Sequence, residues 1–152
     1  MNSSDRIERK ILLKASPARV WQALSEAEHF GRWFGVALTG QHFAVGQRVR
    51  GAVTYPGYEH LTWDVRVERM LPEELFAFSW HPYAIDPAQD YADEPTTQVQ
   101  FQLEEHAGGT LLRVVESGFD GIPVERRLKA FRMNSRGWDE QMSNIENYLQ
   151  QR

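Results

Sequence analysis

The sequence feature that most constrains the fold is a run of apolar residues near the C-terminus, spaced like one face of a helix. Its members step alternately by four and three residues: Val124, Leu128, Phe131, Ser135, Trp138, Met142, Ile145 and Leu149. This spacing predicts one long amphipathic helix from Pro123 to Gln151. Because such a helix has a single apolar face, that face must be buried against another layer of the protein.

The middle of the chain supplies that layer, because apolar and polar residues alternate there as in strands with one covered face. Within 58–70, for example, Trp63, Val65 and Val67 share one side and polar residues take the other. Similar alternation predicts further antiparallel strands over 7–13, 48–55, 75–81, 97–105 and 110–117.

The first predicted strand is followed by two short helices. Ser16 and Pro17 form a helix start signal, and a second helix is expected over Glu26–Trp33. This order of elements predicts an α+β fold in which a curved antiparallel sheet wraps around the C-terminal helix. With 152 residues, the chain is expected to form one domain over positions 1–152.

The composition excludes several classes of function. There are 17 Lys and Arg against 21 Asp and Glu, a formal charge of -4, and the scattered basic residues offer no surface for nucleic acid. The absence of cysteine excludes disulfides, thiolate metal sites and cysteine nucleophiles. No apolar run approaches the roughly 20 residues of a membrane span, and no signal peptide is recognisable. We therefore expect a cytoplasmic protein that binds neither membranes nor nucleic acid.

Five short segments, in order along nearly the whole chain, carry a family likeness: Ile11–Pro17 (ILLKASP), Val20–Leu24 (VWQAL), Arg32–Phe34 (RWF), Val115–Phe119 (VESGF) and Asn134–Trp138 (NSRGW). In these segments the chain resembles bacterial members of the activator of heat-shock-protein-90 ATPase homologue family, within the SRPBCC superfamily. The resemblance implies the helix-grip (START-like) fold. It also implies a cavity between sheet and helix that, in relatives, takes apolar or amphipathic small molecules.

Strand parity and the helical stripe together predict which residues line such a cavity. Ser135 is informative, because a small polar residue in an apolar stripe marks a place where the helix stands off from the sheet. The predicted ligand contacts are Trp63, Phe78, Trp80, Phe101, Val114, Glu116, Phe131, Ser135, Trp138 and Met142. Plain core packing is the alternative for each of them.

Glu116 and His81 are the candidates for acid–base chemistry. Glu116 follows Val114 at period two and should face inward, where an unpaired carboxylate is costly or has a raised pKa. A partner is therefore expected, and an ion pair with Arg132 or Arg136 is the structural alternative to a ligand-binding or acid–base role. His81 could act as a general base at neutral pH, although a histidine at a strand end is often a hydrogen-bonded surface residue.

No sequence pattern for a metal or a nucleotide cofactor is present. The five histidines show no His-x-x-x-His spacing, and the Glu-x-x-His match at Glu26–His29 has no second copy. Neither Gly-x-Gly-x-x-Gly nor Gly-Lys-Ser/Thr occurs. We therefore expect no metal and no cofactor.

Three hypotheses for function follow. The leading one is a protein that binds a hydrophobic or aromatic small molecule between the sheet and the C-terminal helix, with the acidic loop Pro82–Pro95 as its gate. The second is a cyclase-like or hydrolase-like enzyme, as some SRPBCC relatives are, with His81 and Glu116 as acid and base. The third is an interaction protein, either co-chaperone-like as the eukaryotic namesake is, or a homodimer.

Overall fold

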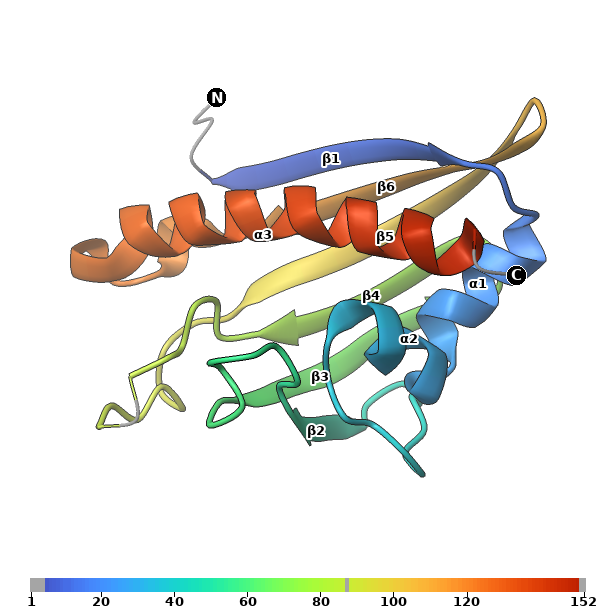
Figure 1. Ribbon diagram of the computed structural model, residues 1–152. Helices are drawn as coiled ribbons and strands as arrows, with labels where there is room; N and C mark the ends of the chain where they lie inside the picture. Colours follow the sequence, from blue (N-terminus) through green and yellow to red (C-terminus); the bar gives the residue numbers. More distant parts are fainter. Residues whose placement is uncertain (1–4, 87, 151–152) are drawn as a thin grey trace.

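A six-stranded antiparallel sheet forms one layer of the protein (Figure 1), as seen in a computed structural model that describes residues 5–86 and 88–150. Along the sheet the strands follow the order β1-β6-β5-β4-β3-β2, and each neighbouring pair is antiparallel. Their bounds are β1 Arg6–Leu13, β2 Arg48–Ala52, β3 Thr62–Leu71, β4 Leu75–Trp80, β5 Thr97–His106 and β6 Gly109–Ser117. The predicted α+β helix-grip fold is confirmed.

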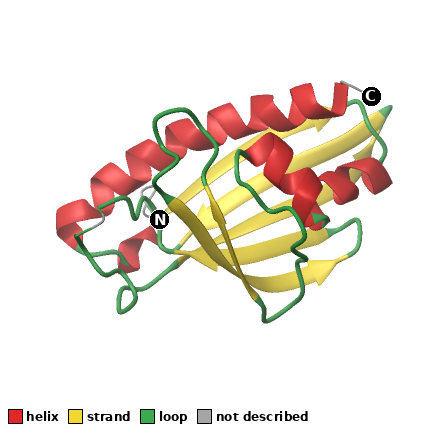
Figure 2. Ribbon diagram, turned by 60° about the horizontal axis from the view of Figure 1, so that its bottom comes forward, coloured by secondary structure: helices red, strands yellow, loops and turns green. Residues whose placement is uncertain are grey.

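The helices cover one face of this sheet (Figure 2). They are α1 (Pro17–Ser25), α2 (Ala27–Phe34) and the long α3 (Val124–Gln150), which follows a 3₁₀ turn, η1 (Phe119–Gly121). The predicted start signal is real, because the Ser16 side chain accepts a hydrogen bond from the Arg19 main-chain N–H. The predicted end of the long helix at Gln151 lies outside the described residues. Within the described ranges, no helix combines the length and hydropathy needed to cross a bilayer.

The sheet face that the alternation predicted to be covered is the one that carries the helices. Trp63, Val65 and Val67 of β3 are all buried. This strand begins four residues later than predicted, at Thr62, because the preceding segment folds into turns in which Leu61 N–H donates to Tyr58 O. The shift leaves the parity unchanged, so the inward face is the same.

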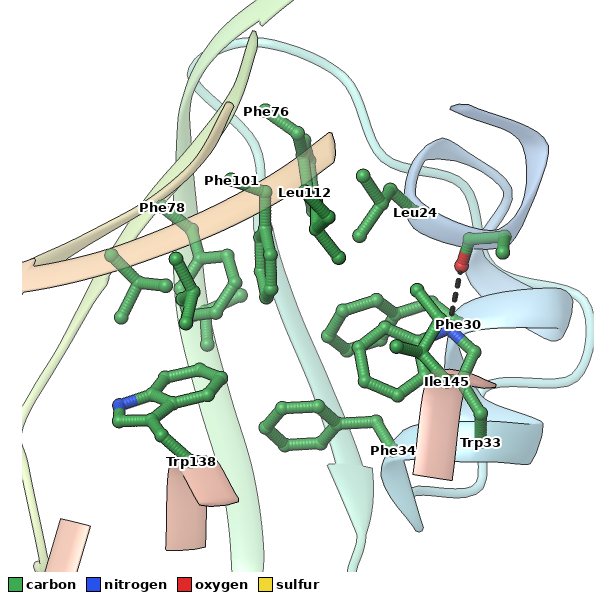
Figure 3. Packing of buried hydrophobic residues seen from close by; sticks show 14 of the residues in the cluster. Leu24, Phe30, Trp33, Phe34, Phe76, Phe78, Phe101, Leu112, Trp138 and Ile145 are labelled. Atoms are coloured by element: carbon green, nitrogen blue, oxygen red, sulfur yellow. Dashed lines mark hydrogen bonds between the residues drawn. The ribbon is translucent and has the colours of Figure 1, made fainter. Parts of the chain in front are cut away.

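Aromatic residues from α2 and the strands form the core between the two layers (Figure 3). Phe30 lies at its centre, with its ring centroid 4.7 Å from that of Phe34, 5.0 Å from Trp33 and 5.3 Å from Trp63. Trp33 also donates from Nε1 to Ala23 O, which ties α2 to α1. The two short helices therefore close one end of the space between sheet and α3.

Only the second half of the α3 stripe is buried, which corrects the prediction of one continuous buried face. Trp138 and Ile145 are buried, whereas Val124 is 73% exposed and Leu128 55% exposed. In Figure 1 the first turns of α3 extend past the end of the sheet, so no strand covers them. The apolar stripe is therefore continuously buried only from Trp138 onward, although Asn134, one turn earlier, still reaches the sheet through Glu116.

This difference in burial predicts that shortening a side chain to alanine lowers stability by unequal amounts along the helix. We expect Ile145→Ala to lower the free energy of unfolding by about 2–5 kcal/mol, because it opens a cavity in the core. Leu128→Ala, the matched control on the exposed half, should change it by no more than about 0.5 kcal/mol. Chemical denaturation of both variants measures this, and equal losses would contradict the assignment of Leu128 to the surface.

Candidate functional site

The most unusual buried group is the carboxylate of Glu116 on β6, which has no exposed surface. In register it lies between Ile7 of β1 and Val99 of β5, both of which are also buried. The inward orientation predicted from strand parity is therefore confirmed.

Four side chains donate hydrogen bonds to Glu116. Its Oε1 accepts from Trp138 Nε1 at 2.8 Å and from Asn134 Nδ2 at 3.0 Å. Its Oε2 accepts from Trp80 Nε1 at 2.7 Å and from Thr97 Oγ1 at 2.6 Å. We call these five residues the Glu116 cluster; they join β4, β5 and β6 to α3.

The predicted ion pair with Arg132 or Arg136 is wrong, since the four partners of Glu116 are neutral and both arginines are exposed. Helical geometry gives the reason. Asn134 and Trp138 are four residues apart and share one face of α3, whereas residues two positions away point to the other side. The carboxylate is therefore stabilised by hydrogen bonds without a countercharge.

Burial raises the pKa of Glu116 above its ordinary value, because the charged form loses its hydration. The hydrogen bonds from Thr97, Trp80, Trp138 and Asn134 favour the charged form and lower the pKa, but burial is the larger effect. Both carboxylate oxygens are already occupied by these donors, which leaves little capacity for a bond to a ligand. The geometry makes Glu116 a residue that positions other side chains.

Two of the side chains that it positions are indoles. The rings of Trp80 and Trp138 lie 5.9 Å apart, and each is about 6 Å from Phe34, at 6.2 Å and 6.1 Å respectively. We call Phe34, Trp80 and Trp138 the aromatic wall. Phe34 and Trp138 are buried, whereas Trp80 is half-buried, so the wall reaches the surface at Trp80.

The remaining predicted ligand contacts fall into two groups. Five lie buried in the core: Trp63, Phe78, Phe101, Val114 and Met142. Two lie half-buried on the first half of α3: Phe131 and Ser135. Among the described residues, Trp63 Nε1 is a buried donor that has no hydrogen-bond acceptor.

Arg9 also contributes to this region, although it is not among the residues predicted from the sequence. It interrupts the apolar side of β1, and the structure gives the reason, because its side chain reaches α3. Arg9 Nε donates to Asp139 Oδ1 at 2.6 Å and Nη2 to Ser135 O at 3.4 Å. A charged residue on the inward side of a strand was the signal that could have located this contact between sheet and helix.

His81 and Glu116 have separate partners. Trp80 directs its indole toward Glu116, and the next residue, His81, instead donates from Nε2 to Glu94 O at 3.0 Å in the acidic loop. The two candidates for acid–base chemistry therefore share no hydrogen-bond partner among the described residues.

Two surface hollows flank α2. One, of about 220 Å³, is lined by residues that include Glu28, Arg32 and Thr54. The other, of about 240 Å³, is lined by residues that include His29 and His42. Neither hollow is lined by α3. In the part of the chain that the structure describes, no three His, Asp or Glu side chains lie close enough to hold a metal ion.

A model of a known protein family covers nearly the whole chain. The family model described as Activator of Hsp90 ATPase homolog 1-like protein matches residues 14–150. No curated protein matches the sequence.

Solved structures share the fold at low identity. Protein MLL2253 from Mesorhizobium loti is 22% identical with a TM-score of 0.73, over 96% of this chain and 97% of that one. DynU16, from the dynemicin biosynthetic locus, is 21% identical with a TM-score of 0.72, over 96% of this chain but only 47% of that one. The Aha1 dimer from Colwellia psychrerythraea is 18% identical with a TM-score of 0.66, over 93% of both chains.

The raised pKa of Glu116 predicts how stability depends on pH. A carboxyl group with a raised pKa contributes its stability fully below its ordinary pKa, and this contribution is lost as the pH rises through the raised value. Glu116→Gln cannot titrate, and it offers one acceptor oxygen to four donors, so we expect it to be less stable near pH 5 by about 1–3 kcal/mol. This deficit should shrink toward pH 8.

Thr97→Val is the matched control, because it keeps the titrating carboxyl group and removes a donor that lowers the pKa. Its deficit relative to the wild type should grow with pH. Thermal or chemical unfolding between pH 4 and pH 8 measures both variants, and a deficit of Glu116→Gln that widened with pH would contradict the raised pKa.

Proposed function

This chain belongs to the family of Activator of Hsp90 ATPase homolog 1-like proteins, and from that premise we propose that it binds a flat hydrophobic or aromatic small molecule between its sheet and α3. The family commonly binds hydrophobic ligands. The ligand site proposed here is the aromatic wall together with the half-buried side chains of the first half of α3.

The observation that carries this proposal is the aromatic wall held in place by one buried carboxylate. Trp80 and Trp138 donate to different oxygens of Glu116, so both indoles are held in fixed orientations. Side chains that are already ordered lose little conformational freedom on binding, which favours affinity. Indole faces suit flat apolar ligands through stacking and the burial of a large apolar area.

The position of the wall also supports a ligand site. It lies beside the stretch of α3 that changes from exposed at Leu128 to buried at Trp138, with Phe131 and Ser135 half-buried between them. A ligand would enter beside this stretch and reach Trp80 first. The unpaired Trp63 Nε1, whose ring lies 5.7 Å from that of Phe34, favours a ligand with a hydrogen-bond acceptor.

The acid–base hypothesis receives less support. Both oxygens of Glu116 are taken by hydrogen-bond donors, and His81 is bonded to the acidic loop. A general base needs a lone pair within hydrogen-bond reach of its substrate. These contacts favour a structural role for both residues over catalysis.

The binding proposal predicts an effect of Trp80 that other tryptophans do not share. We expect the wild type to bind the fluorescent probe 8-anilinonaphthalene-1-sulfonate, and Trp80→Ala to weaken that binding about tenfold, through loss of one stacking face. The control is Trp21→Ala on α1, which lies near the opposite end of α3 (Figure 1). Fluorescence titration gives the affinities, and native mass spectrometry of the purified protein reveals any co-purified ligand. Equal weakening by the two variants would contradict the assigned site.

A second proposal is that two copies of the chain associate through the start of α3. Val124 and Leu128 lie one turn apart and are both largely exposed, as expected of apolar residues that another surface covers. The Colwellia psychrerythraea relative is described as a dimer in solution. Association with a chaperone stays a prediction from the resemblance.

The association proposal predicts a concentration-dependent mass. We expect light scattering to approach twice the monomer mass of 17.6 kDa as concentration rises. Leu128→Glu should keep the protein monomeric, because it places a charge in the proposed contact. Leu12→Glu, at an exposed apolar residue on β1, is the control, and a wild type that remained monomeric at all concentrations would refute the proposal.

A further inference from the structure

We propose that Arg126 is a latch that fastens the acidic loop beside the ligand site, so that its release controls the rate of ligand exchange. The loop is taken here as its described residues, 82–86 and 88–95. This inference rests on the proposed binding function and adds a means of regulating it.

Arg126, in the first turn of α3, holds the two ends of the loop at once. At the start of the loop its Nη1 donates to Pro82 O at 2.7 Å and to Tyr83 O at 3.4 Å. At the end its Nε donates to Glu94 Oε1 at 2.9 Å, and its Nη2 lies 2.7 Å from the same oxygen. Its guanidinium also lies 4.8 Å from the ring centroid of Tyr91. One side chain therefore closes the loop and joins it to the helix.

These contacts are shielded from solvent, unlike those of an ordinary surface ion pair. The Arg126 side chain is 16% exposed and that of Glu94 14% exposed. Charge-assisted hydrogen bonds in such surroundings are stronger than in water, and breaking one leaves a partly buried charge without its partner. Arg132 and Arg136, on the same helix, are exposed.

The backbone of the fastened loop is strained at one of these contacts. Tyr83 has a φ of 52°, in the left-handed region that residues with side chains rarely adopt. Its carbonyl oxygen accepts from Arg126, and Lys129 lies 5.9 Å from its ring centroid. Strain of this kind persists only where surrounding contacts maintain it. Loss of the Arg126 contacts would let Tyr83 relax and the loop move.

The loop is directly connected to the Glu116 cluster. It begins two residues after Trp80 and ends two residues before Thr97, and both of these residues donate to Glu116. Trp80 is the member of the aromatic wall that reaches the surface. A loop fastened by Arg126 therefore lies next to the edge of the proposed ligand site, and its opening gives access to Trp80.

The test compares Arg126→Gln and Arg126→Lys with the control Arg132→Gln, an exposed arginine on the same helix. The Asp86 amide donates to Tyr91 Oη and the Glu94 amide to Tyr91 O, so their hydrogen exchange reports on loop opening. We expect exchange at these amides to rise about tenfold in Arg126→Gln and less in Arg126→Lys, which keeps the charge but not the planar fork.

Stopped-flow fluorescence with 8-anilinonaphthalene-1-sulfonate then measures exchange of a ligand. Association and dissociation should both accelerate about fivefold in Arg126→Gln, with little change in affinity, because a latch changes access and not the bound contacts. The control should match the wild type in both measurements.

Each failure has a distinct meaning. Unchanged amide exchange in both Arg126 variants would overturn the latch. Faster amide exchange with unchanged probe kinetics would overturn control of ligand exchange. A wild type that binds no probe would refute the proposed function and the gating role together. The amide-exchange comparison would still test whether Arg126 holds the loop closed.

Discussion

The structure depends on the burial of one carboxylate. Glu116 is surrounded by the core, has no countercharge among its partners, and is stabilised by hydrogen bonds from β4, β5 and α3. A carboxyl group removed from water is tolerated only where hydrogen-bond donors replace the lost hydration. This requirement sets the position of α3 on the sheet, because Asn134 and Trp138 must both reach the carboxylate.

The placement of α3 then determines where a ligand could act. From Trp138 toward its C-terminus the helix packs on the core, and toward its N-terminus the apolar stripe becomes exposed. The acidic loop is attached to the first turn of the helix through Arg126. The aromatic wall lies at this change. Trp80 and Trp138 therefore have two roles: their indole N–H groups stabilise buried Glu116, and their rings form part of the proposed binding surface.

Much of the fold was predictable because it depends on local patterns. The alternation of apolar and polar residues predicted the covered face of β3 and the inward direction of Glu116. Misplacing the end of a strand by an even number of residues does not change which side chains face inward. The burial of Val124 and Leu128 was predicted wrongly, because helical periodicity shows which side of a helix is apolar but not how far the opposing sheet extends. The exposure of Val124 and Leu128 follows from the length of the strands.

By itself, the sequence determined the order of the elements, the apolar face of each strand and helix, and the presence of an acidic residue on an inward face. These are properties of residues near one another in the chain, where the periods of two and 3.6 operate. The partners of Glu116, the contact of Arg9 with α3 and the fastening of the loop by Arg126 were decided by the tertiary structure alone. Each joins residues distant in sequence, and hydrogen-bond geometry selects among donors only once the chain has brought them together.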